Sequence, residues 1–312
     1  AGFPYASPQP DGFNTIRNPV KVVIDAYNGS VTFYVIDPND PILNVYRQAL
    51  PALFRPLTAL PQSLRHHLRY PQDLFEIQAA QYSTYHMTVP QVFYNGEDLW
   101  ATPLEKYGGE VISMEPYYVL MKLPGEQRLQ FLLMTPLTPY RRDNMIAWLA
   151  ARCDFPGYGE LLVYKLPKER LILGPNQLEA MIDQDTLISQ QLSLWDQRGS
   201  RVIRGNLLVI PVGQAFIYVE PVYLIAETTN IPQLKRVIVS DGNRLAMAPT
   251  LEEALAVVFG GRPPAATAAP GDHADSLAAA REALRAAEQA LGNADWDGFG
   301  RAMQVLKQRL AD

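Results

Sequence analysis

The chain has 312 residues with 32 acidic and 27 basic side chains, which gives a formal net charge of −5. That acidic balance argues against a nucleic-acid-binding protein, because such proteins usually carry a basic domain or stripe. This length allows about two domains with a substantial core. The single cysteine, Cys153, excludes an intramolecular disulfide framework and a cysteine-based zinc site.

The N-terminal part of the chain predicts a β-hairpin followed by helices. The pair Asn28-Gly29 favours a tight turn between two apolar strands, because both residues tolerate positive φ. Beyond Asp37 the spacing of apolar residues becomes helical, and Asp40 can cap a helix that begins with Pro41. The expected strands span 20–25 and 31–36, the expected helices span 41–50, 61–68 and 71–85, and we expect 88–94 to be extended.

A second β-rich block begins at Val111. Pro124-Gly125 predicts a type II turn between two strands. Asp183 and Asp185 are close in sequence but diverge on a helix, and we expect Asp185 to cap the following helix. The expected strands span 111–123, 129–134, 161–166 and 234–240, and the expected helices span 142–152, 176–183, 185–194 and 250–259.

The most apolar stretch of the chain lies at 204–224. A membrane-spanning helix needs about 20 predominantly apolar residues, but Pro211, Gly213 and Gln214 interrupt this stretch in the middle. We therefore expect a hairpin of two strands, 202–210 and 215–225. The first strand shows no polar alternation, so we expect it to be covered on both faces.

A linker rich in proline, alanine and glycine over 261–272 separates a mixed domain, residues 1–260, from a C-terminal unit over 273–312. The apolar spacing of that unit predicts two helices that form an antiparallel hairpin. Its apolar interaction candidates are Leu277, Leu284, Leu291, Trp296, Phe299 and Met303. Two such helices are marginal alone, so we expect them to contact the main domain, a second copy or another protein. The fold class expected for the whole chain is α+β, with antiparallel β-hairpins, interspersed helices and this C-terminal helical hairpin.

The strongest candidates for chemistry are His86, Glu97 and Asp98. A histidine near two carboxylates can serve as a general base or a metal ligand; the alternative interpretation is a polar helix end whose acids cap the next turn. The adjacent His66 and His67 point about 100° apart on a helix and do not suit one metal ion. The chain has no Gly-x-Ser-x-Gly elbow, no phosphate-binding glycine loop and no His-Glu-x-x-His motif. We therefore expect no cofactor and no metal site.

Several strings stand out as a set: Gly12-Phe-Asn-Thr-Ile-Arg-Asn18 with Val22–Gly29, Arg69-Tyr-Pro-Gln-Asp-Leu-Phe75, Tyr85-His86, Asp98-Leu-Trp100, Leu192-Ser-Leu-Trp195 and Gly205-Asn-Leu-Leu-Val-Ile-Pro211. Together they resemble an uncharacterised family of bacterial multi-pass membrane proteins. In that family, several transmembrane helices precede a large soluble region, and this chain resembles the C-terminal part of that region. The resemblance implies a cell-membrane location with this domain outside the cytoplasm. It implies no catalytic residue, because the family has no established activity.

The expected function is a non-catalytic domain of a membrane-anchored envelope protein that mediates interaction with a protein or an envelope component. Its expected partners are its own N-terminal membrane portion, an envelope protein or a second copy, and not nucleic acid. The alternative is a hydrolase that uses His86 with Glu97 or Asp98, which requires these side chains to converge in a concave pocket.

Overall fold

The computed structural model describes residues 12–167, 169–197, 199–213, 215–226 and 231–260. The backbone divides into two compact units, residues 1–247 and residues 248–312. In the second unit the described helix is α7 (Leu251–Phe259), which Thr250 caps by accepting a hydrogen bond from the Glu253 amide. The expected linker and helical hairpin, including Leu277 to Met303, lie outside the described residues and stay predictions.

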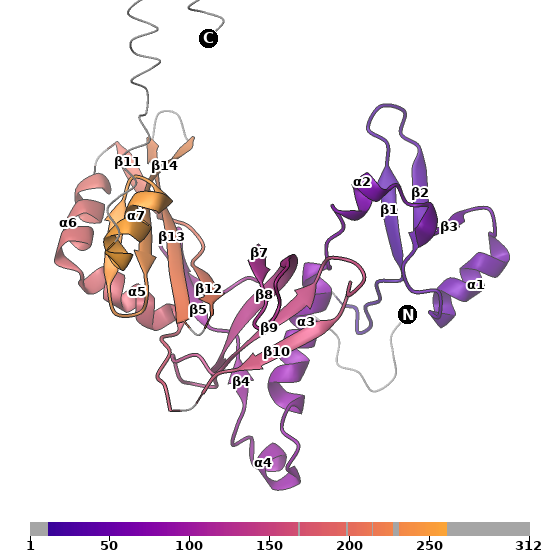
Figure 1. The fold of residues 1–312 in the computed structure, drawn as a ribbon, viewed down its shortest axis with the longest axis horizontal. Helices are drawn as coiled ribbons and strands as arrows, with labels where there is room; N and C mark the ends of the chain where they lie inside the picture. The colour runs from indigo at the N-terminus through magenta and orange to yellow at the C-terminus, as the bar shows by residue number, and fades with distance from the viewer. Residues whose placement is uncertain (1–11, 168, 198, 214, 227–230, 261–312) are drawn as a thin grey trace, which may run out of the picture. The chain divides into compact units, whose positions relative to one another are not determined.

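The first unit opens with the expected hairpin. Strands β1 (Val20–Ile24) and β2 (Val31–Val35) are antiparallel, and β3 (Phe54–Pro56) pairs with β2 in parallel (Figure 1). Gly29 has a φ of +72°, as the turn requires. Helix α1 (Pro41–Ala49) follows, and the carboxylate of Asp40 accepts a hydrogen bond of 2.8 Å from the Leu43 amide. Local sequence signals therefore predicted β1, β2 and α1 correctly, but not β3.

Four short or medium helical segments follow, and one of them corrects an expectation. They are η1 (Leu57–Ala59), α2 (Gln62–Arg65), α3 (Gln72–Tyr85) and α4 (Pro90–Asn95). The segment 88–94, expected to be extended, is largely helix α4. Pro90 occupies its first turn, where a missing amide hydrogen costs nothing. Gly96 closes it in the left-handed conformation, with its amide bonded to the Phe93 carbonyl.

The next sheet has the strand order β10-β9-β8-β4, and β7 also pairs with β8. Its strands are β4 (Trp100–Ala101), β7 (Tyr117–Lys122), β8 (Leu129–Pro139), β9 (Ala147–Arg152) and β10 (Leu161–Lys165), and their pairings are antiparallel. Strands β5 (Leu104–Tyr107) and β6 (Glu110–Ser113) form a separate two-stranded sheet. The single strand expected over 111–123 is therefore two strands, β6 and β7.

Strand β9 overturns the expectation of a helix over 142–152. Five of its six residues are buried, and it pairs with β8 on one side and β10 on the other. A strand covered on both faces carries apolar residues at consecutive positions, so Met145, Ile146 and Leu149 satisfied a helical spacing by coincidence. Periodicity alone does not separate the two cases.

The third large sheet has the order β11-β13-β14-β15, and β12 also pairs with β13. Its strands are β11 (Ser200–Arg204), β12 (Leu208–Val212), β13 (Ala215–Ala226), β14 (Pro232–Ser240) and β15 (Leu245–Ala248). The strand expected over 202–210 is broken at Gly205, whose amide donates to the Pro221 carbonyl at 2.8 Å. A Cβ at this position would lie 2.8 Å from Pro221 Cγ, so only glycine allows this close approach.

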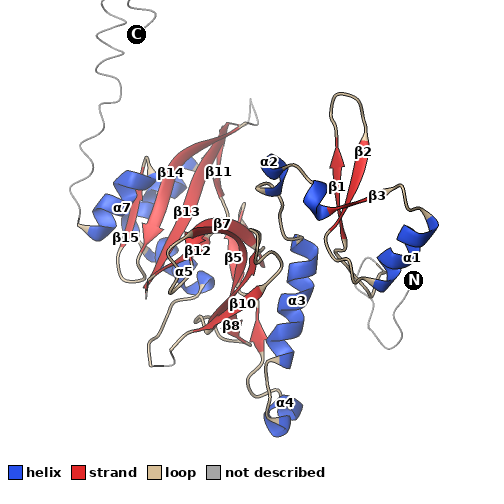
Figure 2. Cartoon of the chain, turned by 45° about the vertical axis from the view of Figure 1, so that its right-hand side comes forward, coloured by secondary structure: helices blue, strands red, loops and turns tan. Residues whose placement is uncertain are grey.

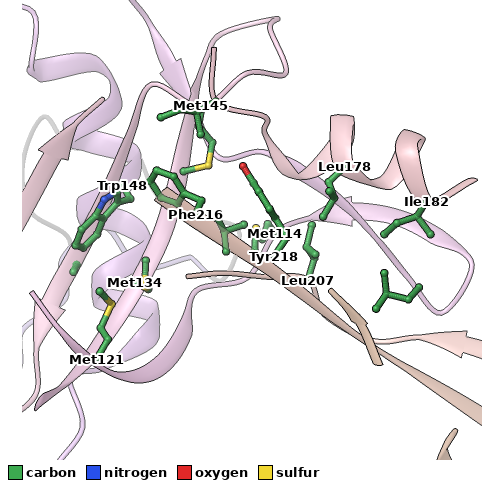
Figure 3. Packing of buried hydrophobic residues seen from close by; sticks show 14 of the residues in the cluster. Met114, Met121, Met134, Met145, Trp148, Leu178, Ile182, Leu207, Phe216 and Tyr218 are labelled. Carbon is green, nitrogen blue, oxygen red and sulfur yellow. The ribbon is translucent and has the colours of Figure 1, made fainter. Parts of the chain in front are cut away.

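Two hydrophobic clusters cover the two faces of β8. Leu132 and Met134 belong to a cluster that also contains Leu178, Leu207 and Tyr218, which come from α5 (Pro175–Gln184), the segment before β12, and β13 (Figure 3). The alternate residues Leu133 and Leu137 belong to a cluster with Phe75 of α3 and with Trp100. Helix α3 lies beside the sheet that contains β8 and β10 (Figure 2). Helix α6 (Thr186–Trp195) follows α5, and Asp185 caps it through the Ile188 amide at 2.9 Å, as expected.

The described residues thus form a mixed α+β fold, with antiparallel sheets and interspersed helices, which confirms this part of the expected fold class. None of the helices within the described ranges combines the length and the apolar character that a membrane span requires.

Candidate functional site

Two of the three candidate residues, His86 and Asp98, lie next to each other. His86 follows the last turn of α3, and its ring stacks on Trp100 with 3.8 Å between ring centroids. The side chain is 2% exposed, Nδ1 donates to the Tyr82 carbonyl at 2.9 Å, and Nε2 lies 3.6 Å from Asp98 Oδ2. The Asp98 carboxylate also accepts a hydrogen bond of 3.3 Å from Trp100 Nε1. The histidine is therefore packed behind the carboxylate.

Asp98, and not His86, faces open space. Its side chain is 46% exposed, and with Glu97 it lines a cavity of about 600 Å³ whose lining does not include His86. Glu97 is exposed and accepts a hydrogen bond of 2.7 Å from Asn95 Nδ2. The three candidates therefore do not converge on one point: the structure joins His86 to Asp98 and leaves Glu97 with Asn95.

A larger cavity, of about 890 Å³, was not predicted from the sequence, and we call it the arginine cleft. It forms where the end of α2 and the following loop meet β7, β8 and the loop after β9. The residues that line it are Gln62, Arg65, His66, His67, Arg69, Leu120, Arg128, Phe131, Asp154 and Phe155. Three of these side chains are permanently charged guanidinium groups.

Backbone carbonyl groups hold Arg65 in place. Its Nε donates to the Leu60 carbonyl at 3.2 Å, and its Nη2 donates to the carbonyls of Leu57 and Thr58 at 3.1 and 2.9 Å. These acceptors are neutral, so they orient the guanidinium without cancelling its charge. Arg65 thus brings a positioned positive charge to the arginine cleft.

Aromatic rings position Arg69. Its guanidinium carbon lies 5.0 Å from the ring centroid of Tyr118 and 6.0 Å from that of Phe131, and these two rings stack at 5.5 Å. The backbone carbonyl of Arg69 accepts hydrogen bonds of 3.0 Å from Lys21 Nζ and Tyr158 Oη. Cation–π contacts and these two hydrogen bonds therefore fix Arg69 from both its side chain and its backbone.

Arg128 supplies the third positive charge from the turn between β7 and β8. It is exposed, and no salt bridge joins it to any residue in the described part of the chain. The carboxylate of Asp154 already accepts a hydrogen bond of 2.7 Å from the Phe131 amide. Three arginines against one aspartate give the lining a formal charge of +2 with neutral histidines, in a chain whose net charge is −5.

A family comparison matches the chain over residues 1–195, which is more than half of its length, to the uncharacterised protein family UPF0182. The chain belongs to the UPF0182 family. Relatives called UPF0182 protein in Salinibacter ruber and Desulforamulus reducens are each 50% identical to it over 332 and 327 residues, and one in Moorella thermoacetica is 48% identical over 321 residues. Each alignment covers 99% of this chain and 35% of the relative, so the chain spans about a third of the length of these curated relatives. No solved structure matches the chain.

The UPF0182 chain also contains a buried ionic cluster centred on Arg204 of β11. The guanidinium contacts Glu179 and Glu220, with 2.8 Å from Nη2 to Glu220 Oε2, and its Nη1 lies 2.8 Å from Asp183. Lys106 pairs with Asp183 on the other side. Burial and the nearby Glu220 carboxylate raise the pKa of Glu179 to about 8. This cluster joins α5 to β5, β11 and β13, so we assign it a structural role.

The described residues contain no group of three or more histidine, cysteine, aspartate or glutamate side chains placed to hold a metal ion. His66 and His67 are both exposed and line the arginine cleft. The clearest sequence signal for that cleft is Arg65-His-His-Leu-Arg69, which places four basic side chains in five positions. Arg128 and Phe131 come from a distant hairpin that the sequence does not tie to this segment.

Proposed function

We propose that this domain is a non-catalytic recognition module that binds anionic groups of an envelope component in the arginine cleft. The observation that carries the proposal is the set of three guanidinium groups around one cavity, two of them positioned by neutral partners. A guanidinium binds carboxylate or phosphate through parallel hydrogen bonds, which adds geometric specificity to the charge attraction.

The lining of the arginine cleft favours binding over chemistry. Among the described residues that form it there is no serine, threonine, cysteine, tyrosine or lysine that could act as a nucleophile. The Asp154 carboxylate already accepts a hydrogen bond from the Phe131 amide, and the side chains of His66 and His67 are exposed. What remains is a set of hydrogen-bond donors beside the apolar faces of Phe131 and Phe155, which is typical of a ligand-binding pocket.

In the cell, the proposal places this domain on the outer side of a membrane-anchored protein. The resemblance to multi-pass membrane proteins supports this location, and relatives about three times as long leave room for a membrane portion. The proposed partners are that membrane portion, an envelope protein or a second copy. Leu277, Leu284, Leu291, Trp296, Phe299 and Met303 remain the proposed contact residues in the C-terminal segment.

Calorimetric titration with pyrophosphate tests the proposal. We expect binding that weakens as salt is added, because the cleft arginines are largely exposed to screening. Replacing Arg69 and Arg128 together by glutamine should weaken binding about tenfold or more. The control variant is Arg201→Gln, an exposed arginine of β11 that does not line the arginine cleft. Equal affinities for the parent, the double variant and the control would refute the proposal.

A second candidate function, hydrolysis, loses the expected His86 base, because His86 does not line the cavity of about 600 Å³. It rests instead on Asp98, which lines that cavity and lies 3.6 Å from His86. In this mechanism Asp98 removes a proton from the attacking water, and His86 orients the Asp98 carboxylate from the side away from the cavity. A screen of chromogenic esters, phosphate esters and glycosides would detect the activity. Hydrolysis that Asp98→Asn abolishes and Glu97→Gln leaves intact would support it, whereas an inactive parent chain would remove it.

A further inference from the structure

A second, smaller cavity of about 280 Å³ lies next to the arginine cleft. The two cavities share the lining residues Arg128, Asp154 and Phe155, so they adjoin at these side chains. Glu126, Gln130, Arg152 and Glu160 are among the residues that line only the second cavity. We call the two adjoining cavities together the groove and treat each as a subsite.

The second subsite differs from the first in charge. Arg152 pairs with Glu126 at 2.6 Å and with Glu160 at 2.8 Å, and it also contacts Gln130. The hydrogen bond from Arg152 lowers the pKa of Glu126, so this carboxylate stays ionised. Two carboxylates and one guanidinium give this subsite a formal charge of −1. The residues lining only the arginine cleft, Arg65 and Arg69, give +2, and the shared Arg128 and Asp154 cancel.

The difference in charge between the two subsites favours some anionic ligands over others. A polymer with a charge on every unit would bring its second charge beside Glu126 and Glu160, where like charges repel. A ligand that carries one anionic group and then a neutral, hydrogen-bonding part would meet favourable partners in both subsites.

The lining of the second subsite suits sugars in particular. Phe155 stacks on Tyr158 with 5.3 Å between ring centroids, and Phe155 and Pro156 both line the cavity. Apolar ring faces pack against the C–H faces of sugar rings, while the carboxylate and amide oxygens of Glu160 and Gln130 can accept hydrogen bonds from sugar hydroxyl groups. On these grounds we infer that the groove binds an oligosaccharide in which an acidic sugar is followed by a neutral sugar. This inference rests on the proposed function and narrows its ligand class.

Calorimetric titration with three probes tests the inference: a hyaluronan tetrasaccharide, which alternates acidic and neutral sugars, trigalacturonate, which is charged on every unit, and tripolyphosphate. The parent chain should bind the hyaluronan tetrasaccharide about tenfold more tightly than trigalacturonate. Glu160→Gln removes one repelling charge, so it should strengthen trigalacturonate binding about threefold. Arg128→Gln should weaken all three, and its unfolding temperature shows whether the fold is intact.

The possible results distinguish a failure of the sugar inference from a failure of the proposed function. If trigalacturonate or tripolyphosphate binds as tightly as the hyaluronan tetrasaccharide, and Arg128→Gln weakens that binding, the sugar inference is wrong and the proposed function stands. If no probe binds, or if replacing Arg69 and Arg128 together by glutamine leaves every affinity unchanged, both are wrong. If binding depends on Arg69 but not on Arg128, the sugar inference is wrong and the proposed function stands. If the hyaluronan tetrasaccharide is preferred but Glu160→Gln leaves the preference unchanged, the charge argument for the second subsite is overturned.

Discussion

Replacing Arg204 by methionine should destabilise the protein strongly at alkaline pH. The guanidinium contacts Glu220 and Glu179, whose side chains are 0% and 1% exposed. Methionine retains much of the length of arginine but leaves both carboxyl groups buried without their cation. Removing one partner from a buried ion pair costs about 3–5 kcal/mol, and we expect a loss of this size in the free energy of unfolding at about pH 8.5.

The loss should depend on pH in a definite direction. The pKa of Glu179 is raised from its ordinary value of 4.5 to about 8 in the folded protein. The folded state therefore holds a proton that the unfolded state has released, and stability falls as the pH rises between these two values. Without the guanidinium, the pKa of both carboxyl groups rises further. For each additional proton that the folded variant holds, the difference in unfolding free energy between parent and variant grows by about 1.4 kcal/mol for every unit of rising pH.

Urea unfolding at about pH 5.5 and pH 8.5 measures this effect. Arg201→Met is the matched control, because Arg201 is exposed on the same strand. It should change stability by no more than about 0.5 kcal/mol. Replacing Arg204, Glu179 and Glu220 together by apolar residues should recover much of the loss. Equal losses for Arg204→Met and Arg201→Met, or a loss that does not grow with pH, would refute the assignment of this cluster.

Two further substitutions test the packing around the sheets. Gly174→Ala would place a Cβ 1.8 Å from the Asp143 carbonyl oxygen. The φ of Gly174 is −87°, which any residue adopts, so steric overlap alone should lower the free energy of unfolding by about 2 kcal/mol or more. An unfolding temperature equal to that of the parent would contradict this. Tyr218→Phe removes the hydroxyl that donates a hydrogen bond of 2.6 Å to the Leu173 carbonyl. It should lower the free energy of unfolding, measured in urea, by about 1 kcal/mol. An unchanged urea midpoint would contradict this.

Local signals in the sequence predicted the first hairpin and the starts of α1 and α6. Asn28-Gly29, Asp40 and Asp185 each act within a few residues, and each occupies the predicted turn or cap. Strand β9 escaped prediction because the two hydrophobic clusters cover both of its faces: Trp148 and Ala150 belong to one, and Leu149 and Ala151 to the other. Pattern reasoning reports which residues are apolar, but not how many faces of an element are covered.

The candidate site divides in the same way. The sequence could suggest that His86 lies near Glu97 or Asp98, because all three fall within thirteen positions of the chain and histidine is rare in it, but it could not choose between the two acids. The arginine cleft was not, because it needs the β7–β8 hairpin to bring Arg128 and Phe131 to the segment at Arg65. Sixty residues separate these parts, and no local pattern encodes the contact.

The most direct test of anion recognition is residue-resolved NMR of the labelled chain during titration with pyrophosphate. We expect the largest changes in amide and arginine side-chain chemical shifts at residues 65–69, 128–131 and 154–155. The same titration of the Arg69→Gln, Arg128→Gln double variant should leave those signals nearly unchanged. Shift changes centred on another surface, or identical changes in the double variant, would contradict the central claim.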